Sequence, residues 1–102
     1  MTDDARPEID VLVHEPARLR VLAFLARVER ADFMYLLRQT GLSRGNLSVQ
    51  TGKLEAAGIL ATERELVGNR PRTTFSLTRS GRRALGRYRR AMEGLLAAFP
   101  VD

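Results

Sequence analysis

Apolar residues recur every three or four positions along the first half of the chain, which is the spacing of one helix face. The pattern predicts a first helix over residues 16–28, starting at Pro16, where a missing N–H is harmless. Asp32 is expected to cap a short second helix that Gly41 ends in a left-handed conformation. Ser43 caps a third helix almost at once. Two helices joined by so short a turn form a helix-turn-helix, although an ordinary helical hairpin has the same spacing.

The third predicted helix, residues 43–57, has an unusual outward face. Leu47 and Leu54 mark its buried side, and the opposite side carries only small residues, with polar ones at its edges. Two of the small residues are glycines, Gly45 and Gly52, and each interior glycine costs a helix about 1 kcal/mol relative to alanine. The glycines therefore indicate that a large partner comes close to this face. The alternative is that they have no role.

The spacing changes after the third helix. Alternation of polar and apolar residues predicts one strand over residues 59–66 and another over residues 74–77. The segment between them, residues 67–73, contains Gly, Asn and Pro and is expected to be a turn. The result is a β-hairpin whose tip carries an arginine on each side of Pro71.

A last helix is expected from Thr78, its cap, to about residue 99. Its apolar residues follow a three-four rhythm that is typical of a helix–helix seam. Because so small a domain needs only part of this helix for its core, we expect the seam to join two copies of the chain. The predicted dimer interface is Leu85, Tyr88, Met92, Leu95, Leu96 and Phe99. The alternative is that the seam only closes the core of the monomer.

Together these elements predict a mainly α, α+β fold. One domain is expected over residues 9–102, after a disordered tail of residues 1–8. No apolar run is long enough for a membrane span and the N-terminus lacks a signal-peptide pattern, so we expect a cytoplasmic protein. The chain has no cysteine and a single histidine, His14, so no metal site and no cofactor are expected.

Charge indicates the class of partner. The net charge of the chain is +5, but it is unevenly placed: residues 1–42 carry −1 and residues 43–102 carry +6. A basic half on a small domain predicts a polyanionic partner such as nucleic acid. The alternative is an ordinary solvated surface.

Three segments in this order resemble the small bacterial winged-helix transcriptional regulators of the MarR/ArsR-like group. They are HEPARLRVLAFL (14–25), ADFMYLLRQTGLSRGNLSVQTGKLEAAGI (31–59) and GNRPRTTFSLTRSGRRAL (68–85). The resemblance implies a winged helix-turn-helix fold and a homodimer that binds double-stranded operator DNA. Gln50 and Gly52 depart from the family pattern, which has a longer side chain in place of the glycine.

The resemblance also implies how DNA would be held. The third helix, residues 43–57, would enter the major groove, and the wing, residues 67–74, would lie on the backbone or in the minor groove. The residues expected at the base edges or at the start of the helix are Ser43, Arg44, Gly45, Asn46, Ser48 and Val49. Those expected on the backbone or in the minor groove are Lys53, Arg70, Arg72 and Thr73. The leading hypothesis is a dimeric repressor.

Other classes remain open. The same fold can dock an acidic protein through its basic face. An enzyme is the weakest hypothesis, because the sequence has no nucleophile elbow, Walker-type phosphate loop or paired metal ligands. A small-molecule effector at the dimer interface, near Tyr35, Tyr88 and Met92, is also an open hypothesis.

Overall fold

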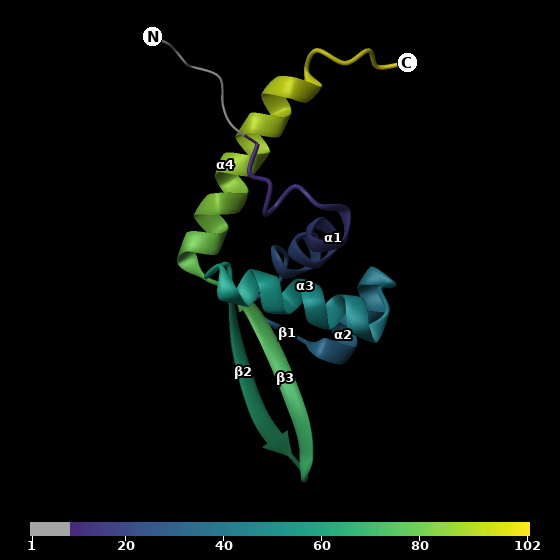
Figure 1. The fold of residues 1–102 in the computed structure, drawn as a ribbon, viewed down its shortest axis with the longest axis vertical. Coiled ribbons are helices and arrows are strands. Elements are labelled where there is room, and N and C mark those ends of the chain that lie inside the picture. The colour runs from purple at the N-terminus through teal and green to yellow at the C-terminus, as the bar shows by residue number, and fades with distance from the viewer. Residues whose placement is uncertain (1–8) are drawn as a thin grey trace.

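The computed structural model of the protein describes residues 9–102, so the tail predicted for residues 1–8 lies outside the described residues. The elements follow in the order α1 (Pro16–Leu25), β1 (Ala31–Asp32), α2 (Phe33–Thr40), α3 (Arg44–Ala56), β2 (Leu60–Val67), β3 (Arg70–Leu77) and α4 (Arg79–Leu96). Helices α1 to α3 form a cluster, from which the β2–β3 hairpin projects on one side and α4 on the other (Figure 1). The predicted mainly α, α+β class is confirmed.

The helix caps lie where the sequence predicted them. Asp32, Ser43 and Thr78 each accept a hydrogen bond from the backbone N–H three residues later, at 2.7, 3.1 and 2.9 Å. Gly41 ends α2 with φ of 71°, a left-handed conformation that glycine adopts without strain. The first helix is shorter than predicted and ends at Leu25, after which the chain tightens into a turn. Val28 still packs against the core from outside the helix.

The sheet has one strand more than predicted. Its order is β1-β3-β2, all antiparallel, with β3 in the centre. The two-residue strand β1 pairs Ala31 with Phe75 and Asp32 with Thr74. So short a segment has no periodicity of its own, and it is a strand only because β3 lies beside it. This pairing ties the start of α2 to the base of the hairpin.

The hairpin is longer than predicted, and the prediction of a turn over residues 67–73 is wrong. The turn consists of Gly68 and Asn69 alone, both with positive φ (56° and 66°), which matches the right-handed twist of the strands on either side. Strands β2 and β3 have eight residues each and pair throughout. Pro71 is tolerated within β3 because β1 does not extend that far, so one edge of the strand is open there.

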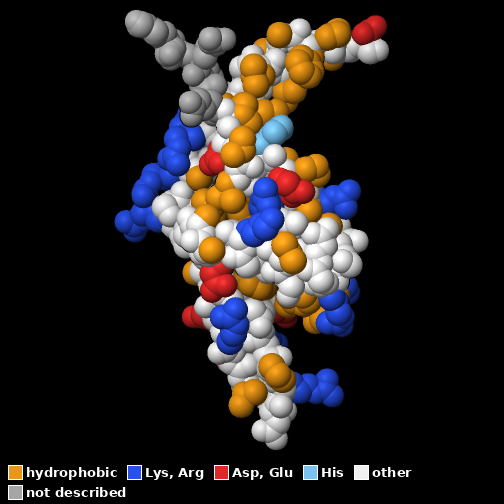
Figure 2. All heavy atoms as spheres, in the orientation of Figure 1, with side chains coloured by type: hydrophobic (Ala, Val, Ile, Leu, Met, Phe, Trp, Pro, Cys, Tyr) orange, Lys and Arg blue, Asp and Glu red, His pale blue; other side chains and the backbone are white. Residues whose placement is uncertain are grey.

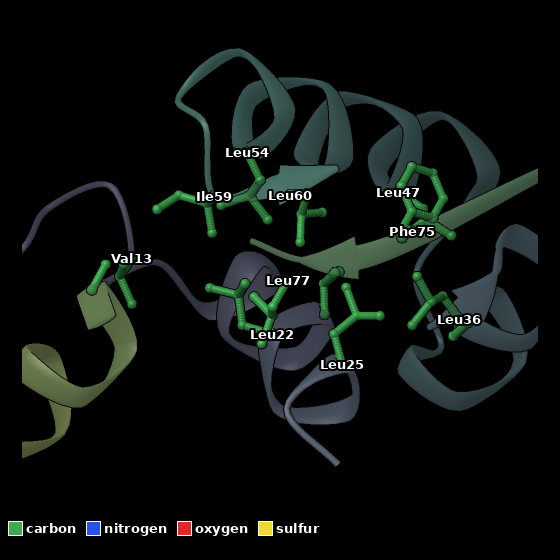
Figure 3. Close-up of a cluster of buried hydrophobic side chains, with 13 residues drawn as sticks. Val13, Leu22, Leu25, Leu36, Leu47, Leu54, Ile59, Leu60, Phe75 and Leu77 are labelled. Carbon is green, nitrogen blue, oxygen red and sulfur yellow. The ribbon is translucent and has the colours of Figure 1, made fainter. Parts of the chain in front are cut away.

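The core is a single apolar cluster between the helices and the sheet (Figure 3). Leu47 and Leu54 of α3 are completely buried, which confirms the predicted inward side of that helix. Val13, in the segment before α1, is also completely buried, so this segment is part of the core as well. The outward side of α3 is consequently held in place by packing from beneath.

Helix α4 divides into a packed part and a free part. In the packed part Gly81, Ala84 and Ala91 are buried, and Leu85 and Tyr88 pack partly against the core. Met92 is half-buried, whereas Leu95, Leu96 and Phe99 are exposed by 50, 49 and 61%. Figure 2 shows apolar side chains gathered along this projecting end. Two of the six residues predicted for the dimer interface therefore also contact the monomer's own core.

Candidate nucleic-acid interface

The outward side of α3 is open along its length. The exposed residues of this side are Ser43, Arg44, Gly45, Asn46, Ser48, Val49, Gly52, Lys53 and Ala56. A Cβ built on either glycine meets nothing within 4 Å, so the face is narrow and unobstructed. The structure thus brings together the seven residues that the sequence predicted for this binding face, which are the cap Ser43 and six residues of α3.

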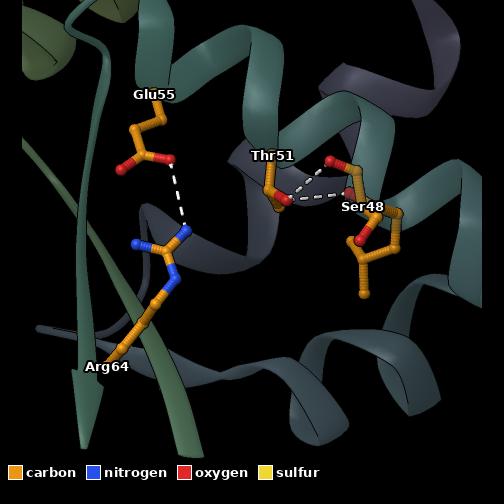
Figure 4. A network of polar contacts seen from close by, with 5 residues as sticks. Ser48, Thr51, Glu55 and Arg64 are labelled. Carbon is orange, nitrogen blue, oxygen red and sulfur yellow. Dashed lines mark hydrogen bonds and ion pairs between the residues drawn. The ribbon is translucent and has the colours of Figure 1, made fainter.

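No acidic side chain stands free on α3. Glu55 is its only acid, and its carboxylate lies 3.7 Å from the guanidinium of Arg64 on β2 (Figure 4). Both groups are partly exposed, so the pair contributes little to stability. The pair instead fixes the orientation of the Glu55 side chain, because it holds the carboxylate toward the hairpin. A polyanion approaching the middle of α3 would meet no uncompensated carboxylate from this helix.

The start of α3 carries the features that favour an anion. Ser43 caps the helix through the N–H of Asn46, and the first turn of any helix has further N–H groups without an intrahelical partner. Arg44 lies beside them, is exposed, and donates a weak hydrogen bond of 3.7 Å to the sulfur of Met34. Its guanidinium is therefore accessible to a phosphate or a base edge.

Asn46 has a buried partner that the sequence did not predict. Its side-chain oxygen accepts a hydrogen bond of 2.8 Å from the amide of Gln50, which is only 8% exposed. Gln50 in turn accepts one of 3.0 Å from Arg18 on α1. The pattern of α3 alone could have placed Gln50 one turn from Asn46, but Arg18 is 32 positions away and only the fold brings it there.

The wing residues are split between the two faces of the hairpin. Arg70 and Arg72 are exposed on one face, and Thr73 lies on the other, since side chains alternate along a strand. Glu65 stands directly opposite Arg72 and reduces the net charge there, a neighbour that the predicted turn over residues 67–73 did not reveal. Arg64, opposite Thr73, is a basic residue on the side of the hairpin that faces α3, and the sequence did not predict it at the interface. A correct hairpin register would have revealed both.

A second basic surface lies on α4. Arg79, Arg82, Arg83, Arg87 and Arg90 line a shallow hollow on its outer side, and Figure 2 shows basic side chains gathered along one side of this helix. The charge of +6 in the second half of the chain is therefore divided between two surfaces. The net charge overstates the charge at α3 itself.

The described part of the chain offers little for other chemistry. Residues 9–102 contain no group of three or more His, Cys, Asp or Glu side chains arranged to hold a metal ion. His14 donates to, or accepts from, the hydroxyl of Tyr88 at 2.8 Å, which links the segment before α1 to α4. Within the same residues, none of the helices has both the length and the apolar content to cross a membrane.

Solved structures share this arrangement. A transcriptional regulator homologue from Pyrococcus horikoshii superposes with a TM-score of 0.70 at 28% identity, covering 84% of this chain and 89% of that one. A MarR-family transcriptional regulator from Silicibacter pomeroyi superposes with a TM-score of 0.59 at 22% identity, covering 88% and 62%. The second likeness concerns the fold alone. The first likeness agrees with the predicted transcriptional regulator, and both agree with the predicted winged-helix fold.

Sequence comparison leads to the same kind of protein. An uncharacterised protein of Methanocaldococcus jannaschii is 34% identical over 71 residues, which is 70% of this chain and 77% of that protein. The family model described as a winged helix DNA-binding domain matches residues 17–96, from the start of α1 to the end of α4. A domain of this kind binds DNA and is not an enzyme. With most of its length matched and the exposed α3 and hairpin in place, the chain belongs to the winged-helix DNA-binding family.

Proposed function

We propose that the protein is a dimeric, sequence-specific regulator of transcription, in which α3 lies in the major groove and the hairpin tip contacts the backbone or the minor groove. The observation that carries this proposal is the outward side of α3, which is exposed, narrow and free of unpaired acids. A helix of this shape can approach base edges closely. The proposed contacts are those predicted from the sequence, with Arg64 added on the hairpin.

The free end of α4 supports the homodimer. Leu95, Leu96 and Phe99 expose about half or more of their surface on a helix that projects from the body of the domain. A second copy packed on them would cover this apolar patch and present two α3 helices to DNA. A two-fold dimer reads half-sites about 34 Å apart, one turn of the duplex. We propose that such a dimer acts in the cytoplasm as a repressor, by occupying its operator.

A small-molecule effector is proposed beside α4. A hollow with a volume of about 970 Å³ lies between the segment before α1 and α4. Tyr88, Arg87 and Arg90 line it, but Tyr35 and Met92, which the sequence prediction had placed near such a site, do not. A fold neighbour, the PcaV regulator of Streptomyces coelicolor (TM-score 0.68, 22% identity), was solved in complex with its natural ligand. The two arginines favour an anionic ligand.

The DNA-binding roles can be separated by two substitutions. Arg72→Ala is expected to weaken binding to every duplex alike, by roughly threefold to tenfold, and to lower the salt dependence by about one ion, because it removes one phosphate contact. Asn46→Ala should leave binding to random duplex unchanged and reduce discrimination between sites by about 1–3 kcal/mol. Fluorescence anisotropy titrations with selected and random duplexes at several salt concentrations measure both.

Arg89→Ala is the matched control for these titrations. Arg89 is exposed on α4 and pairs with Glu93 at 2.9 Å, so its loss removes a charge away from the proposed interface and should change neither quantity. Equal loss of specific and random binding in Asn46→Ala would remove that residue from base recognition. Absence of any duplex binding below roughly 100 μM at low salt would favour docking of an acidic protein instead.

The glycine on the middle of α3 provides a test of close approach. Gly52→Ala should raise the free energy of unfolding by about 0.5–1 kcal/mol, since alanine favours the helix and the new methyl group meets no other atom. The same variant should bind DNA more weakly than the original protein, because the methyl group stands between the helix and the groove. Urea denaturation and DNA titration report the two effects separately.

Gly94→Ala serves as the control for Gly52→Ala. Gly94 is in α4 and is equally unobstructed, so this variant should gain similar stability and keep its DNA affinity. If both variants are stabilised and neither loses DNA affinity, then Gly52 does not serve close approach to DNA. The alternative, that this glycine has no role, then holds.

A further inference from the structure

Arg18, Gln50 and Asn46 form a chain of hydrogen bonds that ends at the proposed DNA-binding face. The guanidinium Nη1 of Arg18 donates to the side-chain oxygen of Gln50 at 3.0 Å, and the amide nitrogen of Gln50 donates to the side-chain oxygen of Asn46 at 2.8 Å. Arg18 is itself held by its Nε, which donates to the carbonyl of Leu12 at 2.6 Å. Gln50 is buried and Asn46 is exposed, so the chain runs from the interior to the surface.

Arg18 fixes the donor and the acceptor of each hydrogen bond in this series. A guanidinium has donors only and is always charged, so the atom of Gln50 that faces Arg18 must be its oxygen. The NH2 group of Gln50 then faces Asn46. An NH2 group cannot accept, so the atom of Asn46 that receives this bond must also be oxygen. The NH2 group of Asn46 is not used in this series of hydrogen bonds and is available at the surface.

We infer that Gln50 and Arg18 are positioning residues that set which base Asn46 recognises. They do so by holding the carboxamide of Asn46 with its NH2 donor toward the DNA. This inference rests on the proposed function, because it assumes that α3 lies in the major groove. A donor needs an acceptor, and guanine, adenine and thymine all present one in that groove at N7, O6 or O4. Cytosine presents only its N4 amino donor. The base that Asn46 contacts is therefore guanine, adenine or thymine, and cytosine is disfavoured because it offers the NH2 group no acceptor.

Gln50→Glu tests this inference, because it replaces only the NH2 group of Gln50 by an oxygen and should reverse the orientation of the Asn46 carboxamide. A glutamate at this position still accepts from Arg18, so the contact between α1 and α3 remains. Its second oxygen can only accept, so Asn46 must turn its NH2 group inward and present its oxygen to the DNA. The preference at the contacted base should then move away from guanine and thymine, which carry no amino donor in the major groove, and toward cytosine, which carries only a donor there. Adenine carries both a donor and an acceptor and fits either orientation of Asn46, so the guanine-to-cytosine preference is the readout. We expect the guanine-to-cytosine ratio to change by about tenfold or more.

The measurement is selection of bound duplexes from a randomised pool, followed by titration of the selected sites. Gln39→Glu is the matched control, since Gln39 is exposed on α2 and receives the same change of charge outside the chain of hydrogen bonds. This control should select the same sites as the original protein. Any general loss of affinity caused by the added negative charge appears in it as well.

Each outcome has a defined meaning. If the original protein selects no common sequence, the proposed function fails, whatever Gln50 does. If it selects a sequence and Gln50→Glu keeps the same guanine-to-cytosine preference at the contacted position, the inference about Gln50 and Arg18 is overturned.

Gln50→Met keeps the test decisive if Gln50→Glu does not fold, as judged by circular dichroism. Methionine neither donates nor accepts an amide bond, so Asn46 becomes free to turn. The preference between guanine and cytosine should then fall to within about twofold, while binding to random duplex is unchanged. Retention of the full preference in Gln50→Met would also overturn the inference.

Discussion

Gly81→Ala is expected to lower the free energy of unfolding by about 2–3 kcal/mol, although alanine favours helices over glycine. Gly81 is in the first turn of α4, and a Cβ built on it would collide with the backbone carbonyl oxygen of Ile59. It would also lie 3.1 Å from the carbonyl carbon of Ile59 and from the hydroxyl of Thr78. A backbone carbonyl cannot rotate aside as a flexible side chain can, so the helix must move.

The contact that Gly81 allows is the junction between α4 and the end of α3. The N–H of Thr78 donates to the carbonyl of Ile59 at 3.0 Å, and the hydroxyl of Thr78 donates to that of Gly58 at 2.6 Å. The hydroxyl of Ser80 donates to the same Gly58 carbonyl at 3.1 Å. A displaced α4 would lose several of these bonds together, which is why the expected effect is large. Urea denaturation followed by circular dichroism measures it.

Gly94→Ala is again the control, because it makes the same change in the same helix at an open position. It should stabilise the protein by about 0.5–1 kcal/mol, so the two variants should move in opposite directions. If Gly81→Ala were stabilised to the same degree, the junction would have room for a methyl group, and the tight packing of α4 on Ile59 described above would be wrong.

The double variant Leu95→Gln/Phe99→Gln is expected to convert a dimer into a monomer and to lower affinity for a two-half-site operator by at least about 100-fold. Both side chains are exposed in the monomer, at 50 and 61%, so their replacement leaves the core intact. In a dimer, binding of the first half-site raises the effective concentration of the second subunit, and this gain of 10²–10⁴ is lost in a monomer. Glutamine is neutral, so the charge facing the DNA is unchanged.

Sedimentation velocity at micromolar concentrations and titration of full and half operators measure the two effects. Affinity for a single half-site should be the same in the double variant and in the original protein. Val101→Gln is the control, because Val101 is a 95% exposed apolar residue beyond the helix and outside the predicted interface. A double variant that still sediments as a dimer would show that another surface joins the subunits.

Several features of the fold follow from short stretches of sequence. The capping of α2, α3 and α4 depends on one side chain and a backbone group three residues away, so Asp32, Ser43 and Thr78 could be identified without knowing the fold. The inward side of α3 follows from helical spacing in the same way. The narrow outward side, with Gly45 and Gly52, was therefore predictable too.

Other features depend on partners far along the chain and were missed or placed wrongly. Strand β1 exists through its pairing with β3, more than 40 positions away. The length of the hairpin follows from a turn that consists of Gly68 and Asn69 alone. Pro71, two residues later, is a typical turn residue, and it led to the prediction of a longer turn and shorter strands. The position of Glu65 opposite Arg72 follows from that register.

By itself, the sequence of this protein determined the helices, their caps, the presence of a hairpin and the face of α3 that is left open, because each of these depends on spacing and hydrogen bonds within a few residues. Only the tertiary structure decided which part of α4 is packed and which is free, how closely Gly81 approaches Ile59, and that Arg18 reaches Gln50 beneath Asn46. The physical reason is that these contacts join segments that are far apart in the chain, and they exist only once a common core has brought those segments together.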